Sequence, residues 1–140
     1  MDTALHFSSK SNEWSTPQDF FDALDKEFKF NLDPAATKEN AKCAKFFTEK
    51  DDGLIQSWGG YRVFCNPPYG RGLRKWVQKA AEEAKKPRTT VVLLIPARTD
   101  TSYFHDFIYG KAEIRFIRGR LKFGGHENAA PFPSMVVIFK

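Results

Sequence analysis

The sequence predicts an α/β protein in which helices cover both faces of a mostly parallel sheet. Strand-like and helix-like segments alternate along most of the 140 residues, as in parallel sheets with crossover helices. The runs TVVLLI at 90–95 and MVVIF at 135–139 are continuously apolar, which is typical of strands covered on both faces. The last two predicted strands have no helix between them, so we expect an antiparallel C-terminal strand.

The first predicted helix covers residues 17–28. Thr16 stands at its N-cap, Pro17 at the first helical position, and Asp19 completes a pattern similar to a capping box. The apolar side chains that follow share one helical face: Phe20, Phe21, Leu24 and Phe28. Three short elements are expected next, namely a strand at 30–33, a helix at 37–44 and a strand at 44–47.

The remaining elements continue this alternation as far as the final two strands. We expect a strand at 61–65, a helix at 73–86, a strand at 90–95, a helix at 101–109 and strands at 112–117 and 135–139. Three of the predicted strands end at a proline, in Asp33-Pro34, Asn66-Pro67 and Ile95-Pro96. Ligands bind beyond the carboxyl ends of the strands in parallel sheets, so we expect the functional site at this edge.

Composition and charge narrow the classes of protein. With 41% hydrophobic residues and no linker, residues 1–140 are expected to form one domain. Nothing resembles a signal peptide or reaches transmembrane length, so we expect a cytoplasmic protein without a membrane contact. Cys43 and Cys65 lack a CxxC spacing and the three histidines are scattered, so no metal site is predicted. Acidic residues crowd the first half and basic residues the second, which suits a cationic cofactor and an anionic polymer.

The string Asn66-Pro67-Pro68-Tyr69 carries the most specific chemistry. An aromatic amino group is a poor nucleophile because its lone pair is delocalised into the ring. Two hydrogen-bond acceptors draw the nitrogen towards a tetrahedral shape: the Asn66 side-chain oxygen and the Pro67 carbonyl, which the two prolines hold in place. Tyr69 offers a flat face on which a flipped base can stack. A tight structural loop is the alternative, but the position after a buried strand favours the catalytic interpretation.

This string is similar to the catalytic tetrad of amino methyltransferases that use S-adenosyl-L-methionine. Nearly the whole chain resembles the phage-type DNA N6-adenine methyltransferase family, compact enzymes often found in prophages. The resemblance is carried by the tetrad and by EWSTP at 13–17, LDPAA at 32–36, FFT at 46–48, DDGL at 51–54, LIPARTDT at 94–101, GRLKF at 119–123 and APFPS at 130–134. It implies a Rossmann-like methyltransferase fold, S-adenosyl-L-methionine as cofactor, adenine N6 in DNA as the methyl acceptor, and a place in the bacterial host cytoplasm.

The resemblance also implies a cofactor site. Asp33-Pro34 stands where the cofactor-binding strand of these enzymes ends, so Asp33 is expected to accept a hydrogen bond from the ammonium of the methionine part. Asp51 or Asp52 is expected to contact the adenosine part. Residues before the first helix are expected to line the same pocket: Trp14, Thr16 and Pro17. The alternatives are a turn cap for Asp33 and a solvated loop for the other two carboxylates.

Basic residues are expected to grip the phosphates on either side of an extruded base, in single- or double-stranded DNA. Two follow the tetrad, one follows the next strand end, and three belong to an apparent basic hairpin: Arg71, Arg74, Arg98, Arg118, Arg120 and Lys122. Solvated surface charge is the alternative for each of them alone. No stretch is long enough for a separate target-recognition domain, and we expect a monomer or a weak dimer.

Two other functions remain open from the sequence. The same tetrad serves enzymes that methylate guanine N2 in RNA or a glutamine side chain in protein, because both carry a conjugated amino group; the basic hairpin favours DNA. A non-catalytic nucleic-acid-binding relative is the other, because Ala35-Ala36-Thr37 lacks the Gly-rich loop that usually follows the first strand in this superfamily. A measurement of cofactor binding distinguishes the two, because an enzyme is expected to bind the cofactor and the non-catalytic relative is not.

Overall fold

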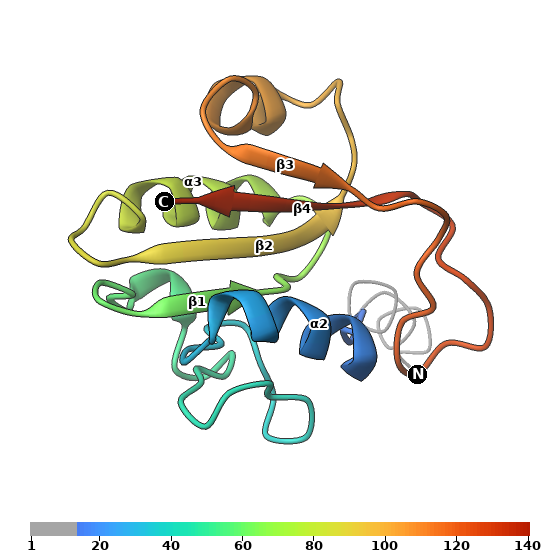
Figure 1. The fold of residues 1–140 in the computed structure, drawn as a ribbon, viewed down its shortest axis with the longest axis horizontal. Coiled ribbons are helices and arrows are strands. Elements are labelled where there is room, and N and C mark those ends of the chain that lie inside the picture. Colours follow the sequence, from blue (N-terminus) through green and yellow to red (C-terminus); the bar gives the residue numbers. More distant parts are fainter. Residues whose placement is uncertain (1–13) are drawn as a thin grey trace, which may run out of the picture.

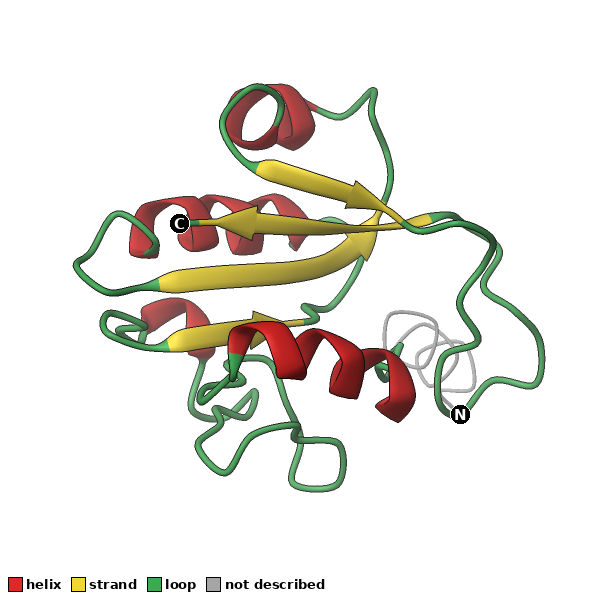
Figure 2. Ribbon diagram, viewed as in Figure 1, coloured by secondary structure: helices red, strands yellow, loops and turns green. Residues whose placement is uncertain are grey.

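The computed structural model describes residues 14–140 as an α/β fold on a four-stranded mixed sheet (Figures 1 and 2). The strand order is β1-β2-β4-β3, with β1 at Arg62–Cys65, β2 at Thr90–Pro96, β3 at Glu113–Phe116 and β4 at Ser134–Phe139. Each matches a predicted strand to within one residue. His6 and Glu13, which entered the sequence analysis, lie outside the described residues.

The α/β class and the antiparallel C-terminal strand are confirmed, but the prediction of a mostly parallel sheet is not. Among the strand pairs of residues 14–140, β1 and β2 run parallel, whereas β4 runs antiparallel to both β2 and β3. Every residue of β4, and all of β2 except Thr90, is buried, as the apolar runs predicted. The sheet therefore depends on two central strands of opposite direction.

Helices cover both faces of this sheet (Figure 1). Helix α3 (Leu73–Glu83) lies behind the sheet and buries Val77 and Ala80. Helix α2 (Gln18–Phe28) crosses in front of β1, where the ring of Phe21 meets the ring of Phe64 edge to face at 5.1 Å. The helix at 73–86 was predicted three residues too long. The helix at 101–109 is only a π-helical turn, η2 (Phe104–Ile108).

Residues 30–47 differ most from the prediction. The two strands expected there are reduced to isolated parallel bridges, Leu32 with Val63 and Asp33 with Phe46, and the helix at 37–44 is a series of turns. Thr37 and Asn40 form one closed turn, in which each side chain accepts a hydrogen bond from the backbone N–H of the other, at 2.7 and 3.1 Å. The turn does not continue as a helix, because the backbone N–H of Lys42 donates to the Asp33 carboxylate at 3.0 Å instead of to a carbonyl four residues earlier.

The predicted N-cap of α2 is also wrong. The helix begins at Gln18, its cap is Pro17, and no side chain caps it. The Thr16 hydroxyl is directed elsewhere, since it accepts a hydrogen bond from Asn66. The sequence pattern is that of a cap, but a tertiary contact has taken the capping oxygen.

The buried carboxylate of Glu83 joins the end of α3 to the turn before β1. It accepts a hydrogen bond from the Trp58 backbone N–H at 2.6 Å and pairs with the Lys86 ammonium at 2.8 Å. Burial raises the pKa of Glu83, but the bonds from Lys86 and Trp58 outweigh it and leave the pKa below 4.5. A carboxylate with a lowered pKa stabilises the fold above its unfolded-state pKa, and this contribution is lost as the pH falls.

Replacing this carboxylate tests the contact. We expect Glu83→Gln to lower the free energy of unfolding by about 1–3 kcal/mol at neutral pH, because a buried charged partner is lost. The gap to the unsubstituted protein should narrow as the pH falls below 4.5. Urea unfolding across this range measures both effects, and the exposed neighbour variant Glu82→Gln is the control. A gap that does not change with pH contradicts this account.

Candidate active site

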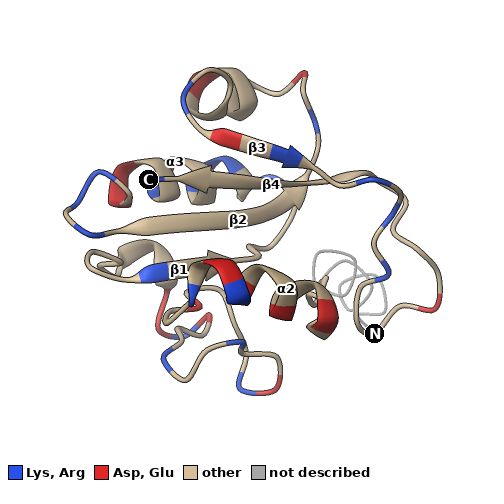
Figure 3. Ribbon diagram, viewed as in Figure 1, with Lys and Arg blue, Asp and Glu red and all other residues tan. Residues whose placement is uncertain are grey.

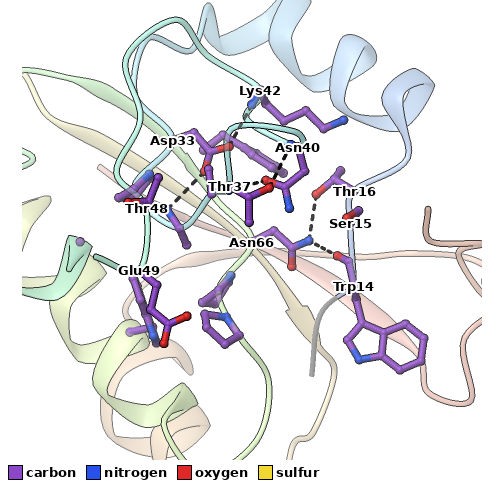
Figure 4. Close-up of a pocket in the computed structure, with 18 of the residues that line it drawn as sticks. Trp14, Ser15, Thr16, Asp33, Thr37, Asn40, Lys42, Thr48, Glu49 and Asn66 are labelled. Carbon is purple, nitrogen blue, oxygen red and sulfur yellow. Dashed lines mark hydrogen bonds between the residues drawn. The ribbon is translucent and has the colours of Figure 1, made fainter. Parts of the chain in front are cut away.

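A cavity of about 430 Å³ opens beyond the carboxyl end of β1 (Figure 4). Its walls come from the segment before α2, the irregular loops after Asp33 and Phe47, the tetrad, and one side chain of α3. The polar residues that line it are Ser15, Thr16, Asp33, Thr37, Asn40, Lys42, Thr48, Glu49, Asp52 and Asn66. The cavity is thus at the strand edge where the sequence predicted a site.

The side chain of Asn66 is held in one orientation. Its Nδ2 donates hydrogen bonds to the Thr16 hydroxyl at 3.0 Å and to the carbonyl of Trp14 (Figure 4). Because both amide hydrogens point to the segment before α2, the Oδ1 atom points away from it. That oxygen accepts a hydrogen bond from the Tyr69 hydroxyl at 2.7 Å. A carbonyl oxygen has two lone pairs, so Asn66 can accept a second hydrogen bond.

Tyr69 is enclosed by other rings. Only 8% of it is exposed, and Phe123 and Phe132 meet it at interplanar angles of 87° and 82°. Its hydroxyl lies between two acceptors, Asn66 Oδ1 at 2.7 Å and the Leu94 carbonyl at 3.1 Å. Burial raises the pKa of Tyr69 far above its usual value, so the hydroxyl keeps its proton and remains a donor. Base stacking on this ring stays a prediction.

Asp33 organises the loop that follows it. Its buried carboxylate accepts hydrogen bonds from the backbone N–H groups of Lys42 at 3.0 Å and Ala35 at 3.4 Å. Burial raises the pKa of Asp33, and these two bonds oppose the rise without cancelling it. Asp33 therefore acts as the turn cap that the sequence left as an alternative, and it also lines the cavity. Its remaining lone pairs are available to a ligand.

The structure brings together most of the predicted cofactor residues. Trp14, Thr16, Asp33, Pro34 and Asp52 line the cavity with the first three residues of the tetrad. Pro17 and Asp51 are not among the lining residues. The Asp51 carboxylate instead accepts hydrogen bonds from the backbone and hydroxyl of Thr48, which lower the pKa of Asp51.

Sequence reasoning missed several polar and aromatic lining residues, among them Asn40, Lys42, Thr48, Glu49 and Trp76. Four of them belong to irregular loops, where no hydrophobic periodicity marks a position. The exposed Glu49 directly follows Phe46-Phe47-Thr48, one of the segments that resemble the family. That neighbouring segment was the signal from which Glu49 could have been identified. The helical spacing of Trp76 on α3 indicates packing, and its ring does stack on that of the buried Trp58, with centroids 6.2 Å apart. Trp76 also lines the cavity, which this spacing does not predict.

Gly53 sets the distance between two walls of the cavity. A Cβ atom at this position would lie 2.1 Å from the carbonyl oxygen of Pro34 and 3.1 Å from the ring of Trp76. Its own carbonyl accepts a hydrogen bond from Nε1 of the buried Trp58 at 2.9 Å, which prevents the backbone from moving aside. The close approach at Gly53 requires a residue without a side chain.

A second cavity of about 450 Å³ adjoins the tetrad on its other side. Tyr69 and Gly70 line this second cavity, whereas the first three residues of the tetrad line the first cavity. Trp14 lines both. Its other walls come from α3, the end of β2 and the segment before β4: Leu73, Pro96, Arg98, Thr101, Tyr103, Pro131 and Phe132. The tetrad therefore separates two adjacent cavities.

The loop 117–133, which joins β3 to β4, packs over the tetrad. Its Gly124 N–H donates to the carbonyl of Ser15 at 2.9 Å, and the ring of His126 stacks on Trp14 at 4.1 Å. Between these contacts Phe123 is buried against both Trp14 and Tyr69. The predicted basic hairpin is thus an irregular loop packed against the site.

The six predicted DNA contacts have different surroundings. Arg98 lines the second cavity, and Arg71 is exposed beside the tetrad. The exposed basic residues of the loop 117–133 are Arg118, Arg120 and Lys122. Arg74 has structural partners instead, since it pairs with Asp106 at 2.9 Å and lies over the ring of Phe107 at 4.9 Å. Five of the six therefore have side chains open to solvent near the site or on the loop.

Residues 14–140 contain no group of three or more histidine, cysteine, aspartate or glutamate residues arranged to hold a metal ion. None of their helices has the length and apolar character needed to cross a membrane.

The sequence also matches known proteins. A family model described as DNA N-6-adenine-methyltransferase (Dam) matches residues 5–140. The chain belongs to this family. It is 34% identical over 110 residues to the DNA N-6-adenine-methyltransferase of Escherichia phage T1, which covers 77% of this chain and 45% of that protein. It is 34% identical over 65 residues to the putative methyltransferase YfdM of Escherichia coli K12, covering 41% of this chain and 71% of that protein.

The family predicted from the sequence motifs is thereby confirmed. The chain spans slightly less than half the length of the phage T1 relative, of which the match covers 45%. The family model, by contrast, extends over nearly the whole chain and includes both cavities and the tetrad.

The close approach at Gly53 leads to a prediction on stability. We expect Gly53→Ala to lower the free energy of unfolding by about 1–3 kcal/mol, because the added methyl group overpacks the wall formed by Pro34 and Trp76. Gly72→Ala is the matched control, since its Cβ would meet nothing within 4 Å. Thermal and urea unfolding measure both variants. Equal stabilities would contradict the steric argument.

Proposed function

We propose that the chain transfers a methyl group from S-adenosyl-L-methionine to adenine N6 in DNA. The observation that carries the proposal is the fixed amide of Asn66, which lines the first cavity with its oxygen directed away from Trp14 and Thr16 and towards Tyr69. Family membership and the name of the phage T1 relative support the reaction and the acceptor. S-adenosyl-L-methionine is the general methyl donor of such enzymes and fits the first cavity.

Residues of the first cavity suit each part of this cofactor. Asp33 presents a buried carboxylate for the ammonium of the methionine part. Lys42 also lines the cavity, and its ammonium, which donates one hydrogen bond to Gln18 Oε1 at 2.8 Å, has two further hydrogens for the carboxylate group of the cofactor. Glu49 and Asp52 offer carboxylates for ribose hydroxyls, and Trp76 a ring for the adenine. When bound, the cofactor would supply an electrophilic methyl group for the amino nitrogen that the tetrad holds. The absence of a Gly-rich loop does not oppose this, because the Asp33 carboxylate itself holds the backbone of the loop after it.

The tetrad would activate the amino nitrogen by accepting both of its hydrogens. The free lone pair of Asn66 Oδ1 takes one hydrogen bond, and the Pro67 carbonyl takes the other. The nitrogen lone pair is then less delocalised into the ring and attacks the methyl carbon, while the bond from that carbon to sulfur breaks. The nitrogen releases one proton to water afterwards, so no strong base is needed. The protonated Tyr69 hydroxyl holds Oδ1 in position.

The DNA would lie across the second cavity and the loop 117–133. Extrusion of the adenine into a pocket beside the tetrad is the usual way to reach an atom inside a duplex. Arg98 on that cavity and the exposed residues Arg118, Arg120 and Lys122 supply positive charge for the flanking phosphates. We further propose that residues 1–140 act as one methyltransferase domain. The parallel bridges at Leu32 and Asp33 support a Rossmann-like origin of the sheet.

A methyl-transfer assay tests the proposal. We expect label from methyl-labelled S-adenosyl-L-methionine to appear in DNA as N6-methyladenine, and Asn66→Ala to lower the rate by at least about 100-fold, as when a key polar group at a reacting centre is removed. Cofactor binding by calorimetry should persist in the variant. RNA and protein acceptors run in parallel. If only the RNA or protein acceptors carry label, the proposed acceptor is wrong and the reaction mechanism stands. If no acceptor carries label and the cofactor does not bind, the non-catalytic alternative is established.

Charge reversal tests the DNA surface. We expect Arg118→Glu/Arg120→Glu to weaken DNA binding and to make the dependence of log affinity on log salt concentration less steep by about two, because two phosphate contacts are lost. Cofactor binding should not change. The matched control is Lys85→Glu/Arg88→Glu in the turn between α3 and β2, at the other end of the sheet (Figure 3). Equal salt slopes for both double variants would exclude the loop from the DNA interface.

A further inference from the structure

The Thr16 hydroxyl lies where the segment before α2 meets the tetrad. Only 6% of Thr16 is exposed, although the residue lines the first cavity. A threonine just before a helix usually caps it, yet no side chain caps α2. The Thr16 hydroxyl instead accepts a hydrogen bond from Asn66 Nδ2 at 3.0 Å. Its use in this contact, at the expense of a helix cap, points to a role in the site.

The Tyr69 side of the Asn66 amide does not by itself fix the orientation of that amide. The Tyr69 hydroxyl lies 2.7 Å from Asn66 Oδ1 and 3.1 Å from the carbonyl oxygen of Leu94. A hydroxyl can both donate and accept. If the amide were turned over, its Nδ2 would donate to the Tyr69 oxygen, and the Tyr69 hydrogen would bond to the Leu94 carbonyl. The methyl acceptor would then meet a donor where it needs an acceptor.

The segment before α2 removes this ambiguity. The carbonyl of Trp14 can only accept, so it requires an N–H group of Asn66 on its side. That bond alone leaves the amide plane free to turn about the Cβ–Cγ bond of Asn66. The second bond, to Thr16 Oγ1, engages the other hydrogen and fixes the plane. The Thr16 hydroxyl therefore sets the direction of the free lone pair on Oδ1, on which the hydrogen bond to the reacting amino group depends.

We propose that Thr16 is a positioning residue, which promotes methyl transfer through Asn66 and not by contact with the cofactor or the DNA. This inference rests on the proposed function. It differs from the role expected from the sequence, in which Thr16 belongs to the cofactor site. The two roles alter different quantities. A cofactor contact sets the affinity for the cofactor, whereas an orienting contact sets the rate constant of the chemical step.

Thr16→Val tests the inference, because valine keeps the branched shape of threonine and cannot accept a hydrogen bond. We expect the rate constant of methyl transfer, measured in a single turnover at saturating cofactor and DNA, to fall about tenfold, as for the loss of one hydrogen bond. The dissociation constant of the cofactor, measured by calorimetry, should not change. Thr16→Ser, which keeps the hydroxyl, should restore the rate constant.

A second buried threonine provides the matched control. Thr89 is 5% exposed, and its hydroxyl accepts a hydrogen bond from the backbone N–H of Gly60 at 2.7 Å. It precedes β2, at the end of the sheet away from the tetrad. Thr89→Val should therefore lower the melting temperature and leave the rate constant of methyl transfer unchanged.

A double-mutant cycle tests whether Thr16 acts through Asn66. In the Asn66→Ala variant, the added substitution Thr16→Val should lower the remaining rate constant no further, because the side chain that Thr16 orients is absent. A purely structural role for Thr16 predicts the opposite result, namely a similar loss in both backgrounds. If Thr16→Val does not fold, Thr16→Ala takes its place with the same expectations.

The outcomes separate this inference from the proposed function. The inference is wrong if Thr16→Val weakens cofactor binding and leaves the rate constant at saturation unchanged, which is the result for a cofactor contact. It is also wrong if Thr16→Ser is as slow as Thr16→Val, or if the cycle shows equal losses in both backgrounds. If the unsubstituted protein methylates no adenine at all, the proposed function fails, and this inference fails with it.

Discussion

The site depends on the clamp around the Asn66 amide. Its Nδ2 is bound by the carbonyl of Trp14 and the hydroxyl of Thr16, and its Oδ1 by the hydroxyl of Tyr69. An amide that is held at both ends cannot rotate, so its acceptor oxygen is oriented before any ligand arrives. Preorganised polar groups of this kind lower a barrier because they need no reorganisation during the reaction. The clamp also joins two segments that are far apart in the sequence, residues 14–16 and 66–69, and the Tyr69 hydroxyl extends it to the carbonyl of Leu94.

The backbone of the loops around the site is held mainly by carboxylate and carbonyl groups instead of by glycine-rich turns. Asp33 collects the backbone N–H groups of Ala35 and Lys42, so the loop after the first bridge curves around a buried charge. Gly53 then allows the next loop to approach the carbonyl of Pro34. One glycine and one aspartate thus shape a wall for which the superfamily usually uses several glycines.

The sequence predicted well wherever burial decided the structure. The two central strands were found within one residue because continuous apolar runs have few other solutions, and the tetrad was found because its position after β1 follows from chain order. The prediction failed over residues 30–47, where Thr37, Asn40 and Asp33 bond to nearby backbone instead of following a helix or strand period. Thr16 illustrates the same limit. Its local sequence has the pattern of an N-cap, but its hydroxyl accepts a hydrogen bond from Asn66, a contact across the fold that local sequence cannot predict.

Trp14 lines both cavities. It is also joined to the loop 117–133 through the rings of Phe123 and His126. Any displacement that an occupant of one cavity imposes on this indole changes the shape offered to the occupant of the other. Thermodynamic linkage makes such an effect reciprocal, so the two ligands must alter each other's affinity by the same factor. The shared indole therefore couples the shapes of the two cavities, so that ligands bound in both would influence each other.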